Sequence, residues 1–320
     1  MSKRGLPRKL FAVLGTLAVL ATGCGSPGEP VDPAPVGSVQ RPEPAGSGPV
    51  DVDSEKSESP DCNATASLPP QAGIPAGSTM AEIRERGHLV AGVDQNTFLF
   101  GFRNPTTGKL EGFDIDIAKE IARAIFGDPE KIRFQAITSA QREDVLMNGE
   151  VDVVVRTYTV NCARRDKVNF SSVYYVAGQR LLVDKTSSVT SLAGLEGERV
   201  CAAKGSTSLK NIAAVSGPIP VQVNDWSDCL VMLQQGQVAA VSTDDTILAG
   251  MAAQDPTTKV VGETFTEEPY GVGIPKENED MVRFVNHVLE LVRGGRWQQS
   301  YDEWVAERLG PASPPQPEYR

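Results

Sequence analysis

Two adjacent arginines, Arg164 and Arg165, follow a very apolar run in a chain of 320 residues whose net charge is −10. They come shortly after a predicted buried strand, Val151 to Val155, at its carboxyl end. Ligands of open parallel sheets bind at that edge. A planar guanidinium makes two parallel, charge-assisted hydrogen bonds to a carboxylate. The position and the residue type therefore favour binding of an anionic group, which one buried arginine can do even in an acidic protein.

Hydroxyl groups lie near the ends of this strand and of a later one. Thr157 and Thr159 are two residues apart, so both side chains can face the same side and hydrogen-bond a ligand. The turn Ser206-Thr207-Ser208 opens a predicted helix, whose first free N–H groups form an anion site. An ordinary helix cap is the alternative interpretation of this turn.

The elements that must position these groups alternate between strands and helices. Ile117, Ile121 and Ile125 recur at four-residue spacing, which predicts an amphipathic helix over 112–125. Such alternation favours an α/β fold with parallel sheets and helices on their faces, and an apolar fraction of 40% is enough for one large or two ordinary domains. The other predicted helices cover 78–86, 139–147, 227–235, 279–293 and 297–308, and the strands cover 88–94, 131–137, 151–155, 181–183, 199–203, 220–223, 238–242 and 259–261.

The N-terminal residues have the composition of a targeting and linking segment. Residues 1–23 combine a basic start with an apolar run of about 12 residues, too short to span a bilayer, and predict a lipoprotein signal peptide. Leu20 to Cys24 resembles a bacterial lipobox, with Ala21 in place of the usual Leu, so lipidation is expected at Cys24; a soluble secreted protein cut nearby is the alternative. Residues 24–75 are predicted to form a disordered Pro/Gly/Ser-rich tether. We therefore expect an extracytoplasmic protein, lipid-anchored to the outer face of the cell membrane.

Four cysteines remain beside Cys24, an even number that suits an oxidising compartment. Three pairings are possible, and we favour Cys201 with Cys229, on a predicted strand and the helix that follows it, which leaves Cys62 with Cys162. A metal site is the competing interpretation, but the chain has no CxxC spacing and only two histidines. We therefore expect no metal and no cofactor. The net negative charge argues against nucleic acid as a partner.

Five blocks of sequence stand in a fixed order between about residues 80 and 306. They are Gly112-Phe-Asp-Ile-Asp-Ile-Ala; Leu146-Met-Asn-Gly-Glu-Val-Asp with Thr159, Arg164 and Phe170-Ser171; Gly205-Ser-Thr-Ser; Gly236-Gln-Val-Ala-Ala-Val with Asp244; and Tyr270-Gly-Val-Gly-Ile. Together they resemble the bacterial extracellular solute-binding proteins of family 3, which bind polar amino acids. The ordered combination is far more specific than any one block.

This resemblance implies a two-lobed fold of the type II periplasmic-binding-protein class. Two α/β lobes, joined by two crossing hinge strands, close on a ligand by hinge motion. The crossings are expected near 177–182 and 268–274. Lobe 1 is then discontinuous, over 76–177 and 270–310, lobe 2 spans 178–269, and 311–320 form a Pro-rich tail.

The resemblance also implies roles for four side chains. Arg164 matches the arginine that holds the α-carboxylate of an amino acid, and Asp244 matches the carboxylate that receives the α-ammonium group. Ser139 and Arg142 match a pair that meets the distal carboxylate in members that bind glutamate and aspartate. Arg165 is expected to point elsewhere, as a solvated surface residue.

Two further positions qualify this assignment. Asp94 lies where many members make a second polar contact, and Phe100 can either pack against the ligand's methylenes or belong to the core. Members that bind acidic ligands can carry an arginine where this chain has Asp94, and Trp226 stands where some carry a histidine. Without that additional arginine, the site should discriminate less well between ligands with an acidic side chain and those with an amide side chain. We therefore expect L-aspartate or L-glutamate together with L-asparagine or L-glutamine, in that order.

We expect a monomeric binding protein that delivers these amino acids to an ABC-type importer. A sensor, whose closed form is read by a membrane signalling protein, is the alternative and has the same binding site. A dehydratase-like enzyme is a further alternative, because such an enzyme exists on this fold. Neither His88 nor His287 is placed for acid–base catalysis, so we expect no enzyme.

Overall fold

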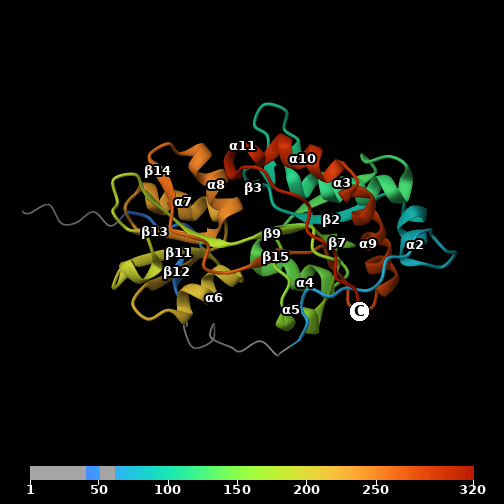
Figure 1. Cartoon of the computed structure of the whole chain (residues 1–320), viewed down its shortest axis with the longest axis horizontal. Helices are drawn as coiled ribbons and strands as arrows, with labels where there is room; N and C mark the ends of the chain where they lie inside the picture. Colours follow the sequence, from blue (N-terminus) through green and yellow to red (C-terminus); the bar gives the residue numbers. More distant parts are fainter. Residues whose placement is uncertain (1–40, 51–61) are drawn as a thin grey trace, which may run out of the picture. The chain divides into compact units, whose positions relative to one another are not determined.

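The computed structural model describes residues 41–50 and 62–320. The predicted signal peptide and the lipidation site Cys24 lie outside these residues. Within them, the chain forms two main sheets, each in its own α/β lobe, and a pair of strands that connects the lobes (Figure 1). None of the helices in these two ranges combines the length and the apolar character needed to cross a membrane.

Lobe 1 is built on a five-stranded sheet with the order β6-β2-β7-β16-β8. Strand β2 runs parallel to β6 and β7, whereas β16 is antiparallel to β7 and β8. Successive side chains of a strand point to opposite faces, so Val153 enters one apolar core and Val154 another. The sheet is therefore covered on both faces. Its strands are β2 (Leu89–Val93), β6 (Ile132–Ala136), β7 (Val153–Val154), β8 (Asn169–Phe170) and β16 (Gly273–Ile274).

Helices with one apolar face cover this sheet (Figure 1). The predicted stripe Ile117, Ile121 and Ile125 is buried along α3 (Phe113–Phe126), and acidic side chains occupy its first turn, where the helix dipole favours negative charge. The helix predicted over 139–147 is a 3₁₀ turn, η1 (Ser139–Gln141), continued by α4 (Arg142–Met147). The remaining helices of lobe 1 are α2 (Thr79–Arg86), α5 (Cys162–Lys167), α9 (Glu279–Arg293), α10 (Arg296–Trp304) and α11 (Ala306–Leu309).

A small three-stranded sheet follows β2 and was not predicted. It is antiparallel throughout and brings Phe98 and Phe102 to ring centroids 4.8 Å apart. It is formed by β3 (Asn96–Thr97), β4 (Gly101–Arg103) and β5 (Leu110–Glu111).

Lobe 2 is built on a six-stranded sheet with the order β1-β12-β11-β13-β10-β14, on which α6, α7 and α8 pack (Figure 1). The prediction of parallel sheets is wrong for part of it, because β10 runs antiparallel to both β13 and β14. The elements, beside the turn η2 (Leu192–Leu195), are β10 (Gln179–Asp184), β11 (Arg199–Ala203), α6 (Thr207–Ala214), β12 (Ile219–Val223), α7 (Trp226–Gln234), β13 (Ala240–Asp244), α8 (Asp245–Gln254) and β14 (Thr258–Val261).

Two antiparallel strands connect the lobes, β9 (Tyr175–Ala177) and β15 (Glu268–Tyr270). The second crossing lies where the sequence predicts it. The first lies earlier than 177–182, because residues from Gln179 onward already belong to the lobe 2 sheet as β10. The exact lobe boundaries stay a prediction.

The prediction that residues 24–75 are a disordered tether is wrong for the described parts of that range. Strand β1 (Gly48–Pro49) pairs with the edge strand β12, which has free backbone groups to offer. Ala66 and Ser67 are buried, and Ser67 donates to the carbonyl oxygen of Phe170 over 2.8 Å. Low hydrophobicity does not keep these residues out of the fold because backbone hydrogen bonds and a disulfide hold them.

The structure joins Cys62 to Cys162 and Cys201 to Cys229, the pairs favoured from the sequence. The first disulfide ties residues 62–78, the lead segment that precedes α2, to α5 in lobe 1. The second ties β11 to α7 in lobe 2. The Pro-rich tail also docks, because Tyr319 forms a bridge with Ser67. The residues around Ser67 and the C-terminal tail therefore meet beside the lobe 1 sheet.

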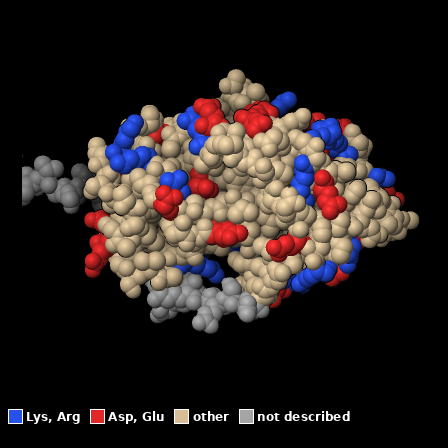
Figure 2. Space-filling view, in the orientation of Figure 1, with Lys and Arg blue, Asp and Glu red and all other residues tan. Residues whose placement is uncertain are grey.

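Charged side chains are dispersed over the face that Figure 2 presents. Lys and Arg alternate with Asp and Glu, with uncharged surface between them. On this face, the described residues do not gather into the broad basic surface that nucleic acid requires.

Candidate functional site

Two buried guanidinium groups lie over one aromatic ring at the carboxyl end of β7. The guanidinium carbons of Arg142 and Arg164 lie 4.5 and 5.0 Å from the ring centroid of Tyr158. Arg142 begins α4, and Arg164 lies in α5, whose N-cap Asn161 accepts the Arg164 backbone N–H. These two short helices bring together the residues predicted to bind the ends of an amino acid.

Arg142 is held by backbone carbonyl groups. Its Nε donates to Ser139 O over 2.9 Å, and its Nη1 donates to Thr157 O over 3.2 Å. Its Nη2 donates to Gly205 O, in lobe 2, over 3.2 Å. Burial, followed by the nearby Arg164, lowers the pKa of Arg142 to about 9, so the group stays cationic at neutral pH.

Arg164 has an equivalent arrangement on the neighbouring helix. Its Nη1 donates to Thr159 O over 2.6 Å, and its Nη2 donates to Gly205 O over 3.1 Å. Both arginines of lobe 1 therefore share one neutral acceptor in lobe 2. Backbone carbonyl groups neutralise neither guanidinium, and the carboxylate of Glu143 lies 3.9 Å from Arg164 Nε, beyond hydrogen-bond distance. Both guanidinium groups can therefore still bind an anion.

Gly205 makes this contact between the lobes possible. Its φ is +75°, and a Cβ atom there would stand 2.7 Å from the Cα of Ala140 in lobe 1. A side chain would therefore strain the backbone and separate the lobes at this point.

Asp94 and Ser139 do not point freely into the site, because both bind a third arginine. The carboxylate of Asp94 lies 2.7 Å from Arg156 Nη2, and Ser139 Oγ accepts from Arg156 Nη1 over 2.6 Å. The sequence interpretation missed Arg156, which has no exposed surface. The sequence did contain a signal for Arg156, because it directly follows the predicted buried strand 151–155. A charged side chain in that position is expected to be buried and to need a buried partner.

Thr157 adopts an uncommon backbone conformation beside these arginines. Its φ is +39°, and its N–H donates to Asp114 Oδ2 over 2.7 Å. Both Thr157 and Thr159 are buried, and each offers its backbone oxygen to an arginine. Both threonines thus lie at the site, where their backbone carbonyl oxygens accept hydrogen bonds from the two arginines.

On the lobe 2 side, Asp244 presents a buried carboxylate. It is the N-cap residue of α8, its Oδ2 accepts from the Tyr270 hydroxyl, and its Oδ1 has no hydrogen-bond partner among the described residues. Burial, followed by the neighbouring Glu268, raises the pKa of Asp244 well above its usual range. An incoming ammonium group would offset both effects.

The turn Ser206-Thr207-Ser208 serves mainly as a helix cap, the alternative to the anion site that was considered from the sequence. Ser206 Oγ accepts from Leu209 N over 3.1 Å, and Thr207 Oγ1 donates to Glu268 Oε2 over 2.7 Å. Glu268, on the hinge strand β15, is buried and was not predicted. A hydroxyl of lobe 2 is thereby fixed to the hinge.

A polar cavity of about 300 Å³ opens beside Arg164, at the seam between the lobes, and neither Arg142 nor Asp244 lines it. That volume suits a small ligand, and most of the lining residues are polar or charged. The lining is Ser139, Ala140, Glu143, Asn161, Ala163, Arg164, Lys167, Lys204, Gly205, Thr207 and Lys210. Lys167 is paired with Glu143, at 2.7 Å, while Lys204 and Lys210 add positive charge from lobe 2.

Phe100 and Arg165 are placed away from this cavity. Phe100 belongs to the core, which was one of its two expected roles, with ring centroids 5.5 Å from Phe113 and 5.4 Å from Tyr175. The expectation that Arg165 is solvated is wrong: it is buried, and its Nε donates to Ala64 O of the lead segment. Burial, followed by the positive charge of Arg320, lowers the pKa of Arg165 to about 10.

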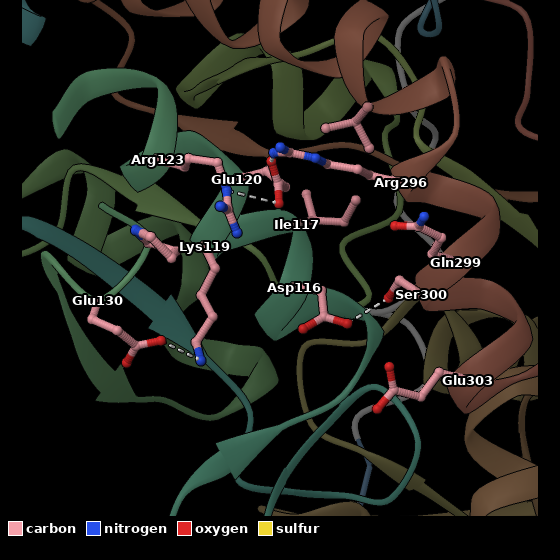
Figure 3. Close-up of a pocket in the computed structure, with 12 residues that line it drawn as sticks. Asp116, Ile117, Lys119, Glu120, Arg123, Glu130, Arg296, Gln299, Ser300 and Glu303 are labelled. Carbon is pink, nitrogen blue, oxygen red and sulfur yellow. Dashed lines mark hydrogen bonds and ion pairs between the residues drawn. The ribbon is translucent and has the colours of Figure 1, made fainter. Parts of the chain in front are cut away.

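A larger cavity, of about 370 Å³, lies on the outer side of lobe 1 between α3 and α10 (Figure 3). Most of its charged side chains already have partners: Glu120 pairs with Arg123 and Arg296, and Lys119 pairs with Glu130. Ser300 donates to Asp116 over 2.6 Å. Because these groups satisfy one another, this cavity offers a ligand less than the seam does.

The chain has clear relatives. The profile of the bacterial extracellular solute-binding proteins, family 3, matches residues 89–307. The ABC transporter glutamine-binding protein GlnH of Bacillus subtilis is 40% identical over 232 residues, which cover 72% of this chain and 85% of that protein. A glutamine-binding protein of Geobacillus stearothermophilus is 45% identical over 205 residues, 63% of this chain and 78% of that protein. The glutamate-binding protein GluB of Corynebacterium efficiens is 33% identical over 239 residues, which cover 71% of this chain and 80% of that protein.

Solved structures show the same fold. An ancestral arginine-binding protein bound to glutamine has a TM-score of 0.62 and 34% identity, covering 71% of this chain and 99% of that one. The holo ArgBP of T. maritima has a TM-score of 0.64 and 27% identity, and the match covers 70% of this chain and 98% of that one. The predicted fold class, with two lobes of the type II periplasmic-binding-protein kind, is confirmed.

Proposed function

Because the chain belongs to the bacterial extracellular solute-binding proteins, family 3, we propose that it binds one free polar amino acid between its lobes and delivers it to an ABC-type importer. The single observation that supports this most is the pairing of charge across the seam. Two buried guanidinium groups in lobe 1 donate their hydrogen bonds to backbone carbonyl oxygens, and the carboxylate of Glu143 lies 3.9 Å from Arg164 Nε. A buried carboxylate oxygen of Asp244 in lobe 2 has no hydrogen-bond partner among the described residues.

A zwitterion complements this arrangement. The α-carboxylate would replace the Gly205 carbonyl as the acceptor of Arg164, and the α-ammonium group would bind Oδ1 of Asp244. Each exchange gives a buried charge a charged partner in place of a neutral one or none, and charge-assisted hydrogen bonds are about twice as strong as neutral ones. Arg142 would then bind the distal oxygen of the ligand's side chain.

The ligand we propose is L-glutamine or L-glutamate, with L-aspartate and L-asparagine binding more weakly. The relatives with 40 and 45% identity are named for glutamine, and one with 33% identity is named for glutamate. Arg142 can donate to an amide oxygen as well as to a carboxylate. This order revises the sequence prediction, which put the acidic ligands first.

Calorimetric titration of the chain without its first 24 residues, with each of the twenty amino acids, tests this proposal. Arg164→Ala should weaken binding of every ligand about 100-fold, because two charge-assisted hydrogen bonds are lost. Arg133→Ala, an exposed arginine of β6, is the matched control and should bind normally. If no amino acid binds, or if Arg164→Ala binds as tightly as the wild type, the proposed function is wrong. Any conversion of a bound amino acid would favour the enzyme alternative.

The identity of the membrane partner distinguishes delivery to an importer from sensing. Crosslinking of the full-length protein on cells, followed by mass spectrometry, should capture permease subunits of an ABC transporter. A membrane signalling protein as the main crosslinked partner would contradict delivery and support the sensor.

We also propose that the protein is anchored outside the cell membrane by lipid on Cys24. The basic and apolar residues that precede the lipobox support this, as does membership of an extracellular family. The N-terminal peptide of the mature protein should carry diacylglycerol on Cys24, and Cys24→Ser should release the protein into the medium. An unmodified cysteine in membrane-bound protein would contradict the anchor.

A further inference from the structure

Asp114 connects three segments that meet behind the arginines. It is the second residue of α3 and is 1% exposed. Its Oδ2 accepts from Thr157 N over 2.7 Å, and its Oδ1 accepts from the Tyr174 hydroxyl over 2.7 Å. Thr157 follows β7 at the site, and Tyr174 immediately precedes the hinge strand β9. One carboxylate therefore holds the start of a helix, a site residue and the approach to the hinge.

Thr157 needs such a support because of its backbone conformation. Among the described residues, only Leu99 and Thr157 have a positive φ without being glycine. Left-handed backbone is least accessible to β-branched residues, so a free Thr157 would return to extended backbone. Its φ of +39° points its carbonyl oxygen at Arg142, whose Nη1 lies 3.2 Å away. The hydrogen bond from Thr157 N to Asp114 opposes that return.

The charged groups around Asp114 are few. Asp94 approaches from the end of β2 and Arg156 from the loop after β7, and these two are paired with one another. Tyr174 contributes a neutral hydroxyl whose pKa is raised well above its usual range by burial. Burial raises the pKa of Asp114 to about 7, although both hydrogen bonds oppose that shift.

We propose that Asp114 is a positioning residue: its negative charge holds Thr157 in the left-handed conformation, and the Thr157 carbonyl in turn orients the Arg142 guanidinium toward the ligand. Asp114 touches no ligand in this arrangement. The inference rests on the proposed function, since it concerns the affinity of the same site. Protonation of Asp114 leaves Thr157 N with a neutral acceptor, which makes a weaker hydrogen bond. Ligand affinity should therefore fall as the pH falls through about 7.

The isosteric variant Asp114→Asn isolates this charge. The dissociation constant of L-glutamine should be measured by calorimetry between pH 5.5 and 8.5, about 1.5 units either side of neutrality, for the variant and the wild type. The ratio of the two constants cancels the titration of the ligand's own α-ammonium group at the highest pH and any contribution from Asp244. The variant should bind about tenfold more weakly at the highest pH, by loss of one charge-assisted hydrogen bond, and the two proteins should converge at the lowest pH. A ratio that is constant with pH would overturn the proposal.

A second variant tests the route through Thr157. Glycine adopts a positive φ without strain, so Thr157→Gly removes the need for the support. The added effect of Asp114→Asn on affinity should then shrink to less than about threefold, from about tenfold in the wild-type background. Equal effects in both backgrounds would show that Asp114 does not act through this backbone conformation.

The test does not require Asp114→Asn to fold. Thr157→Gly alone should bind L-glutamine with a weaker dependence on pH near neutrality than the wild type has, and an unchanged dependence would contradict the proposal. If the wild type binds L-glutamine but these comparisons fail, only this inference is wrong. If the wild type binds no amino acid, the proposed function itself is wrong.

Discussion

Asp94 and Arg156 form a buried ion pair, with 2.7 Å between Oδ2 and Nη2 and side chains that are 5% and 0% exposed. The pair changes the role of Asp94. The resemblance to the family predicted a polar contact to the ligand, but its carboxylate also accepts from the N–H groups of Gln95 and Asn96 and from the Thr97 hydroxyl. Asp94 is thus a structural anchor for a site arginine, which in turn fixes Ser139.

Asp94→Asn should destabilise the fold by about 3–5 kcal/mol, because it leaves Arg156 as an uncompensated buried charge. Glu130→Gln is the control, since its partner Lys119 and its own largely exposed side chain form a surface pair. Such pairs are worth about 0–1 kcal/mol. Urea unfolding measures both variants. Equal losses of stability would show that the Asp94 pair is no more important than a surface contact.

Arg164→Ala and Arg165→Ala should have opposite consequences, although the residues are adjacent. Arg164→Ala should abolish most of the ligand affinity. Arg165→Ala should leave affinity unchanged and lower the free energy of unfolding by about 1–3 kcal/mol, because the Ala64 carbonyl loses a charged donor. Calorimetry and urea unfolding of the two proteins separate these effects. A loss of affinity in Arg165→Ala would contradict its assignment to the lead segment.

Much of the fold was predictable because its elements carry one-sided apolar patterns. The helix that was missed, α8 (Asp245–Gln254), is buried from Thr246 to Met251 and so has no polar face to create a period. The other missed helix, α5, has only six residues, and four of them are charged. The direction of β10 depends on how the chain crosses between lobes, which no local pattern records.

The site was predictable in position but not in detail. Arg142, Arg164 and Asp244 lie at the seam because each stands at or beyond the end of a strand, and that placement can be inferred from the alternation of strands and helices. Their present partners could not be inferred, since the Gly205 carbonyl is a backbone atom from the other lobe. Arg165 was misplaced because its partner, Ala64, lies in a segment whose composition predicts disorder.

Gly205→Ala should weaken ligand binding, and Gly197→Ala should not. Both glycines have a φ near +75°, so both substitutions should cost about 1–2 kcal/mol of stability through backbone strain. Only at Gly205 would the new Cβ meet the opposite lobe, whereas no atom lies within 4 Å of the corresponding position at Gly197. Affinity for L-glutamine, with urea unfolding as the stability reference, distinguishes the two. Equal affinities would mean that the lobes need not approach so closely to hold a ligand.

Stability and affinity should respond to pH in opposite directions. The pKa of Asp114 rises on folding from 3.8 to about 7, so the folded chain binds the proton more tightly than the unfolded chain. The free energy of unfolding should therefore decrease as the pH rises from about 4 to about 7, by about 1.4 kcal/mol per pH unit from this group. Asp244, whose pKa is also raised by burial, contributes in the same direction. Urea unfolding of the ligand-free protein across this range measures the slope, and Asp114→Asn should reduce it. Stability that rises with pH over the whole range would show that these carboxyl groups are not desolvated in the folded protein.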